Sequence, residues 1–267
     1  MNAPHTQAAV VAIREGAVLR LVLNRPAARN ALSEGLMGEL QEALDSAAED
    51  TTVRVIVLAA EGPAFCAGHD LKEMTGHRCG TDAGREAFAK IFAQCSHLMQ
   101  SIVRHTKPII ARVHGVATAA GCQLVASCDL AIASTHARFA TPGVNIGLFC
   151  STPMVALSRN VARKHAMEML LTGGMIGAEQ ALQIGLVNRV VAPELLEPQT
   201  MTLANEIAAK PVQTVKIGKE AFYRQLEMPL AEAYDYASTV MTKNMLAAEA
   251  EEGIGAFIDK RPPKWPE

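Results

Sequence analysis

The chain has 267 residues, of which 49% are hydrophobic and 19% charged, and its formal net charge is −2. This is the composition of a globular protein with a sizeable core, and the scattered basic residues give no sign of nucleic-acid binding. No apolar run approaches the roughly 20 residues that cross a bilayer, so we expect no membrane span.

The first half of the chain alternates strand and helix signals. β-Prone runs at Ala9–Arg14 and Val18–Leu23 surround a glycine-containing turn and predict a hairpin. Ser33 is a candidate N-cap for a helix with apolar residues at helical spacing. Continuous apolar runs, typical of strands covered on both faces, follow at residues 53–59, 109–115 and 129–134.

Helical segments separate these apolar runs, at residues 82–105 and after residue 119. Strands that alternate with helices predict βαβ units, and therefore an α/β fold with a mostly parallel sheet. The last third of the chain is helical, with helices predicted at Pro193–Lys210, Pro211–Glu227 and Pro229–Glu251.

We expect residues 1–195 to form the core and residues 196–267 a helical C-terminal region, with both belonging to one structural unit. The cysteines are spread over positions 66, 79, 95, 122, 128 and 150 without a Cys-x-x-Cys pair, so we expect no metal site and reduced thiols. The first ten residues, MNAPHTQAAV, resemble neither a signal peptide nor an arginine-rich transit peptide, which predicts a cytoplasmic location.

Two loops follow buried strands at their carboxyl ends, where α/β proteins bind ligands. They cover Gly62–Asp70 and Gly115–Gln123, and each enters a helix through small residues. A helix that starts within the stretch AAGCQLVASCD would point its free N–H groups at a developing negative charge. Two converging N–H donors would form an oxyanion hole, which stabilises charge that arises in a transition state.

Several segments together resemble a known family. They read LNRPAARNALS, GPAFCAGHDLKE, VHGVATAAGCQLVASCDLAIAS, FATPGVNIGL, MLLTGGMIGAEQALQIGLVNRVV and EGIGAFIDKRPPKW. In this order they resemble the enoyl-CoA hydratase/isomerase (crotonase) superfamily over essentially the whole chain. Within it, GHDLKE, ATAAGCQLVASCD and TPGVNIGLFCSTP look closest to the group called enoyl-CoA hydratase domain-containing protein 3.

The resemblance implies a spiral of ββα units with a helical C-terminal region that builds a trimer, or a dimer of trimers. It also implies an acyl-CoA substrate, with coenzyme A as part of that substrate and no separate cofactor. The oxyanion hole would use the backbone N–H groups of His69 and Ala120, although most members have glycine in place of Ala120.

Residues for the coenzyme A moiety also follow from the resemblance. The moiety would lie along Ala67, Gly68, Asp70, Leu71 and Lys72. Its phosphates would meet Arg25 and Arg29, and its adenosine end would meet Phe257 and Lys260 of a neighbouring subunit. For the three basic residues a solvated surface charge is an equal alternative, and for Phe257 core packing is the alternative.

The sequence departs from the family at the positions of the catalytic glutamates. Members that add water to a double bond use two glutamates, whose positions here are Gln123 and Gly143. Glutamine holds a water by hydrogen bonds but does not accept its proton, and positioned acid–base groups contribute roughly 10²–10⁴-fold each. The position of the acid in dienoyl isomerases is Ser151. We therefore expect weak hydration.

What remains near these motifs leaves three functions open. His69 titrates near neutral pH, and Cys150 could line the acyl end of the site. The first function is an acyl-CoA enzyme of lyase or isomerase type in fatty-acid metabolism, acting through a stabilised thioester enolate. The second is decarboxylation of a malonyl- or methylmalonyl-CoA, because a related branch has histidine at His69, although it has tyrosine where Cys150 stands. The third is acyl-CoA binding without catalysis.

Overall fold

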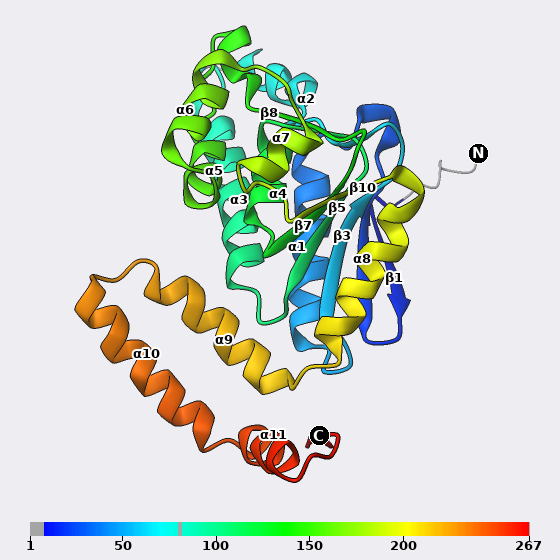
Figure 1. The fold of residues 1–267 in the computed structure, drawn as a ribbon. Coiled ribbons are helices and arrows are strands. Elements are labelled where there is room, and N and C mark those ends of the chain that lie inside the picture. The colour runs from blue at the N-terminus through cyan, green and yellow to red at the C-terminus, as the bar shows by residue number, and fades with distance from the viewer. Residues whose placement is uncertain (1–7, 80–81, 267) are drawn as a thin grey trace.

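The computed structural model of the chain describes residues 8–79 and 82–266. Figure 1 shows a compact upper body of sheets and helices, with the last helices extending below it. The predicted α/β class is confirmed by this arrangement, in which consecutive parallel strands are joined through helices.

The larger sheet runs through the centre of the body. Its strand order is β1-β2-β3-β5-β7-β10, and the β1–β2 hairpin is antiparallel whereas the other pairs are parallel. These strands are β1 (Val10–Glu15), β2 (Val18–Leu23), β3 (Val55–Ala60), β5 (Ile109–Val113), β7 (Leu130–Ser134) and β10 (Arg189–Val191). The hairpin and the buried strands therefore lie where the sequence predicts them.

A second, smaller sheet has no counterpart in the sequence predictions. Its order is β4-β6-β8-β9, formed by β4 (Ala64–Cys66), β6 (Val116–Thr118), β8 (Arg138–Ala140) and β9 (Ile176–Gly177). Strands of two or three residues are too short to show a period-2 pattern. Because β4, β6 and β8 each follow a strand of the larger sheet, the chain climbs as a spiral of ββα turns.

Helices wrap the two sheets and continue beyond them. They are α1 (Glu34–Glu49), α2 (Leu71–Gly76), α3 (Arg85–Arg104), α4 (Ala120–Ser127), α5 (Pro153–Asn160), α6 (Arg163–Thr172), α7 (Ala178–Gln183), α8 (Pro193–Ala208), α9 (Val212–Gln225), α10 (Leu230–Met245) and α11 (Ala248–Ile258). The Ser33 hydroxyl caps α1 by accepting the Leu36 N–H at 3.1 Å, as predicted. Among the described residues, no helix is both long and apolar enough to cross a membrane.

One helix predicted from the sequence is wrong. The segment Pro229–Glu251 is not continuous, because extended backbone at Ala247 separates α10 from α11. The buried Glu249 carboxylate explains the break, since it accepts N–H groups of Gln213 and Thr214 at 3.0 and 2.8 Å. These bonds hold the start of α11 against the start of α9.

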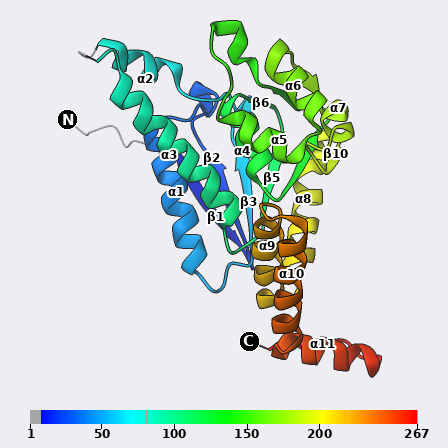
Figure 2. The same cartoon turned by 90° about the vertical axis from the view of Figure 1, so that its left-hand side faces the viewer.

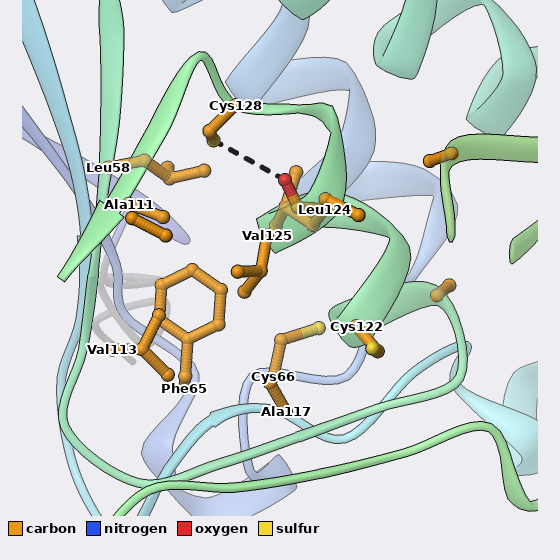
Figure 3. Close-up of a cluster of buried hydrophobic side chains, with 14 of the residues drawn as sticks. Leu58, Phe65, Cys66, Ala111, Val113, Ala117, Cys122, Leu124, Val125 and Cys128 are labelled. Carbon is orange, nitrogen blue, oxygen red and sulfur yellow. Dashed lines mark hydrogen bonds between the residues drawn. The ribbon is translucent and has the colours of Figure 1, made fainter. Parts of the chain in front are cut away.

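The hydrophobic core lies between the larger sheet and the helices that follow its strands. Figure 3 shows the fully buried Phe65 ring among Leu58, Val113 and Val125. α8 covers the opposite face, where Ala204 and Ala208 join a second buried cluster. The predicted boundary between residues 195 and 196 falls inside this helix, and the helices that extend below the body begin with α9 (Figure 2).

A buried ion pair joins α9 to the body. The Lys219 ammonium lies 2.7 Å from the Asp129 carboxylate, and the Tyr223 hydroxyl donates to the same carboxylate at 2.9 Å. Asp129 also accepts the N–H of Ile109 at 2.7 Å, which links it to the first residue of β5. Asp129 is thus a structural residue.

Candidate active site

The two strand-end loops predicted to carry chemistry lie against each other. A Cβ built on Gly68 would stand 3.0 Å from the Ala119 Cβ and 3.6 Å from the Ala120 nitrogen. Gly68 has φ of +95°, a conformation that glycine adopts without strain. The loop after β4 and the loop after β6 therefore meet at the start of α4.

The first of these loops leaves the His69 N–H free to face a ligand. Leu32 donates to the Gly68 carbonyl at 2.7 Å and accepts the Asp70 N–H at 3.0 Å, which forms an isolated parallel bridge opposite His69. In such a bridge the N–H of the intervening residue points away from its partner. The N–H of His69 therefore faces away from Leu32.

The second loop starts α4 at Ala120, as the sequence predicts. N–H groups in the first turn of a helix have no partner within the helix, so that of Ala120 is available. Ala119 precedes it with φ of 50° and ψ of −119°, a region sparsely populated by residues with a side chain. Strain of this kind gathers at functional sites, and sequence patterns give no signal of it.

Close packing holds this turn in place. A Cβ on Gly121 would stand 2.1 Å from the carbonyl oxygen of Cys66, so the first turn of α4 presses directly on β4. All eight residues of α4 are buried. The orientation of its N-terminal N–H groups is therefore fixed by the core.

His69 presents a neutral imidazole at this site. Both of its ring nitrogens are buried without a hydrogen-bond partner among the described residues. Burial lowers the pKa of His69, and the Leu32 backbone partly opposes this shift. The Phe92 ring packs edge-on at 5.6 Å between centroids. A neutral imidazole offers one donor and one acceptor.

Gln123 lies one turn into α4, and its side chain is almost completely enclosed. Only 5% of the residue is exposed, and its Oε1 atom has no hydrogen-bond partner in the described part of the chain. Thr141, which the sequence analysis missed, has the same property: it is 1% exposed and its Oγ1 atom is unpartnered among the described residues. Residue type and spacing do not reveal it, because they do not specify whether a buried threonine hydroxyl finds a hydrogen-bond partner.

Gly143 has no room for a side chain. A Cβ there would stand 2.4 Å from the Leu148 carbonyl oxygen and 2.9 Å from the Cys150 sulfur. Cys150 is buried, and this burial raises the pKa of its thiol, so it lines the site as a neutral group. Ser151 is exposed, and its hydroxyl bonds to the Phe149 carbonyl of its own loop. The structure therefore does not bury Ser151 together with Gln123, Gly143 and Cys150.

Asp70 and Arg25 hold the segment expected to bind coenzyme A. Asp70 caps α2 by accepting the N–H groups of Lys72 and Glu73 at 3.2 and 3.3 Å. Arg25 lies 3.2 Å from Asp70 and also donates to the Ala31 carbonyl at 2.9 Å. Arg25 is therefore a partly buried structural cation.

The other residues of this segment differ in exposure. Leu71 and Lys72 are exposed at the start of α2, and Arg29 is exposed beside them. Ala67 donates its N–H to the Arg29 carbonyl at 3.1 Å. Leu71, Lys72 and Arg29 are thus accessible to solvent, and two of them carry positive charge.

Phe257 and Lys260 are not brought to this edge within one chain. They lie at the end of α11, at the bottom of Figure 1, whereas α2 lies at the top. Phe257 is 84% exposed, so it is not a core residue of the single chain. Its predicted contact from a neighbouring subunit stays a prediction.

The cysteines near the site are packing residues. Burial raises the pKa of Cys66 and of Cys122 to about 12, so both stay protonated at neutral pH. Figure 3 shows Cys66 on β4 and Cys122 in the first turn of α4. In the described ranges no three His, Cys, Asp or Glu side chains gather in a way that could hold a metal ion.

The lowered pKa of His69 predicts how the free energy of unfolding depends on pH. A histidine whose pKa is lower in the folded state binds its proton more readily when unfolded. Its contribution is therefore complete above the unfolded value of about 6.5 and is lost as the pH falls below it. We expect His69→Gln to lose less stability than the wild type between pH 7 and pH 5, measured by urea unfolding.

The matched control is His97→Gln, which replaces an exposed histidine of α3. It should keep the pH slope of the wild type. His105 is also buried with a lowered pKa. It should therefore leave some dependence of stability on pH in His69→Gln. Equal slopes in His69→Gln and the wild type would contradict a buried neutral imidazole.

Comparison with known proteins adds to this geometry. The family described as Enoyl-CoA hydratase/isomerase matches residues 14–267. The mouse protein named enoyl-CoA hydratase domain-containing protein 3, mitochondrial, is 48% identical over 94% of this chain and 82% of its own length.

Two solved structures are similar over nearly their whole length. One, described as an enoyl-CoA hydratase of Mycobacterium smegmatis, has a TM-score of 0.93 and 53% identity, and covers 97% of this chain and 99% of its own. Human enoyl-CoA hydratase domain-containing protein 3 has a TM-score of 0.91 and 45% identity, with coverage of 96% and 100%. The family and the group predicted from the motifs are thereby confirmed.

The same comparison corrects the predicted cytoplasmic location. The similar mouse, rat and human proteins are all named mitochondrial. The sequence prediction rested on the first ten residues alone, and these residues do not decide the compartment.

Proposed function

The chain belongs to the enoyl-CoA hydratase/isomerase family and is an acyl-CoA enzyme of that family, and from this premise we propose that it stabilises a thioester enolate in an oxyanion hole. The donors are the backbone N–H groups of His69 and Ala120. The observation that carries the proposal is the contact between their two loops, where the built Gly68 Cβ stands 3.6 Å from the Ala120 nitrogen. Fixed donors at a developing negative charge lower the barrier without reorganising during the reaction.

Coenzyme A lies along the loop from Ala67 to Lys72 in this proposal. Lys72 and Arg29 stand exposed at that loop and are free to meet phosphates. Arg25 acts indirectly, because its pair with Asp70 holds the loop in shape. The loop shape in turn sets the direction of the His69 N–H.

The reaction that this site supports is one that needs little acid–base help. The positions of the usual glutamates hold Gln123 and Gly143, and Ser151 is exposed and bonds to the Phe149 carbonyl. We propose a lyase or isomerase reaction on an acyl-CoA in fatty-acid metabolism, with weak hydration of simple enoyl thioesters.

Decarboxylation of a malonyl- or methylmalonyl-type thioester is the second candidate. The neutral His69 ring favours it, since both ring nitrogens are buried and unpartnered among the described residues and one of them can carry a proton. Carbon dioxide leaves with the electron pair retained on the α-carbon, and the oxyanion hole holds the resulting enolate. A proton then returns to that carbon from His69 or water.

Assembly through the C-terminal helices forms part of the proposal. α10 contains no buried residue, and its large apolar side chains Leu230, Tyr234 and Met241 are 76, 69 and 66% exposed. Apolar area of this extent marks an interaction site. A homotrimer, or a dimer of trimers, would cover it and bring Phe257 and Lys260 of one subunit to the coenzyme A of another.

A substrate panel tests the proposed function. We expect the protein to bind crotonyl-CoA, a 3-enoyl-CoA, malonyl-CoA and methylmalonyl-CoA, and to turn over at least one of them. His69→Ala should keep binding and lower turnover if the imidazole moves a proton. Unchanged turnover would restrict the role of His69 to its N–H. Binding without turnover of any thioester would favour acyl-CoA binding without catalysis.

A further inference from the structure

The imidazole ring of His69 is oriented by packing. Both of its ring nitrogens are buried, and neither has a hydrogen-bond partner among the described residues. The ring of Phe92, from α3, packs against the imidazole with 5.6 Å between the ring centroids and 81° between the ring planes. Aromatic rings favour this edge-to-face arrangement, because the positive edge of one ring meets the negative face of the other. The Phe92 ring therefore restrains the orientation of the His69 side chain.

One short segment at the start of α1 holds both rings in place. Leu32 bonds to the backbone on both sides of His69. Two residues further along the chain, the Glu34 carbonyl accepts the side-chain amide of Gln94 at 3.0 Å. Gln94 lies in the same turn of α3 as Phe92, and α3 runs beside α1 (Figure 2). The same segment therefore fixes the backbone of His69 and the part of α3 that carries Phe92.

The direction of the His69 N–H depends on the peptide group between Gly68 and His69. The carbonyl and the N–H of this group lie in one plane, and the Leu32 N–H holds the carbonyl at 2.7 Å. Gly68 adds little restraint, because glycine adopts many backbone conformations without strain. The other end of the group is the His69 Cα, and an anchored side chain keeps that atom in place. The contact with Phe92 thus adds a second restraint on the N–H.

We propose that Phe92 is a positioning residue for the oxyanion hole, which holds the His69 side chain so that the His69 N–H stays directed at the thioester oxygen. This inference rests on the proposed function, because it concerns one of the two proposed donors. A hydrogen bond weakens steeply when its donor is misaligned, so a rotation of this peptide group would reduce the stabilisation of the enolate. Phe92 acts through His69 and needs no contact with the substrate.

Phe92 can be replaced without removing a core residue. Its side chain is 37% exposed, whereas the neighbouring Ile91 and Cys95 are buried and attach α3 to the core. Phe92→Leu keeps an apolar side chain but removes the flat ring that meets His69. We therefore expect this variant to fold and to melt close to the wild-type temperature.

Infrared difference spectroscopy of a bound thioester tests the proposal. The probe is butyryl-CoA with a ¹³C label at the thioester carbonyl, which has no double bond to hydrate. Hydrogen bonds to a carbonyl oxygen weaken the C=O bond, so the wild type should lower its stretching frequency relative to the free probe in buffer. Phe92→Leu should lose about half of this lowering or more, because one of the two donors is misaligned. Binding of the probe, measured by isothermal titration, should persist.

Two further variants of α3 serve as controls. Phe92→Tyr keeps the aromatic ring at a partly exposed position, so it should retain the wild-type carbonyl band. Phe88→Leu removes the other phenylalanine of α3, whose ring lies 5.4 Å from the Arg78 guanidinium, and it should also retain that band. Phe92→Met gives a second measurement should Phe92→Leu not fold.

The outcomes separate this inference from the proposed function. A carbonyl band that is lowered equally in the wild type and in the folded Phe92→Leu or Phe92→Met would overturn the role of Phe92. An equal loss in Phe88→Leu would overturn it as well, because the effect would then be a general loosening of α3. Both results leave the oxyanion hole intact. A wild type that binds the probe without lowering its carbonyl frequency would instead overturn the proposed oxyanion hole, and with it the inference.

Discussion

Hydration of crotonyl-CoA by this protein is expected to be slower by about 10⁴-fold or more than by a family member that has both glutamates. Each positioned acid or base contributes roughly 10²–10⁴-fold, and both are absent here. The structure strengthens the expectation at Gly143, because a Cβ there would stand 2.4 Å from the Leu148 carbonyl oxygen. A glutamate could enter only if the loop from Gly143 to Cys150 moved.

Restoring one acid should recover part of that rate. Gln123→Glu places a carboxylate at the general-base position, and we expect crotonyl-CoA hydration to rise by about 10²-fold. The rate should stay well below that of two-acid members, since Gly143 stands at the position of the second acid. Product analysis after long incubation with crotonyl-CoA measures the change in rate.

Gln100→Glu serves as the matched control, because it adds the same charge on the exposed face of α3. It should hydrate crotonyl-CoA at the wild-type rate. A wild-type rate similar to that of two-acid members would show that an acid reaches the site from elsewhere. No gain in a folded Gln123→Glu would show that the missing base is not what limits the reaction.

Asp129→Ala is expected to cost about 3–5 kcal/mol in the free energy of unfolding. The change leaves the Lys219 ammonium, whose side chain is 8% exposed, without its carboxylate partner. It also removes the acceptor for the Tyr223 hydroxyl and for the Ile109 N–H. Urea unfolding at fixed protein concentration measures the loss, since assembly would make stability depend on concentration.

Glu227→Ala gives the comparison for an exposed pair. Its contact with Arg159 at 3.2 Å joins side chains that are 66 and 57% exposed, so we expect a loss below about 1 kcal/mol. Adding Lys219→Met to Asp129→Ala should recover part of the loss, because no unpaired charge then remains buried. A loss in Asp129→Ala as small as in Glu227→Ala would contradict the structural role of the buried pair.

The sequence was informative where the signal is local. The apolar runs at β3, β5 and β7 are long enough to predict buried strands, and the small residues before Gln123 predict where α4 begins. The two loops could be located because loops at the carboxyl ends of neighbouring parallel strands meet at one edge. That Gln123 and Gly143 stand where acids are usual came instead from the resemblance to the family.

The C-terminal helices show the limit of a local signal. Residues 229–251 have a helical composition throughout, but Glu249 bonds to the start of α9, and the chain breaks at Ala247 to allow it. The four short strands of the second sheet are likewise set by pairing with distant segments. Neither the helix break nor the short strands can be predicted from the residues next to them in the sequence.

The sequence by itself therefore determined the family, the strand-end loops and the absence of the usual acids. Only the tertiary structure decided that Gly143 has no space for a side chain and that the hydroxyl of Thr141 has no partner among the described residues. The physical reason is that space and hydrogen-bond partners depend on atoms from distant segments, which residue type and spacing do not specify.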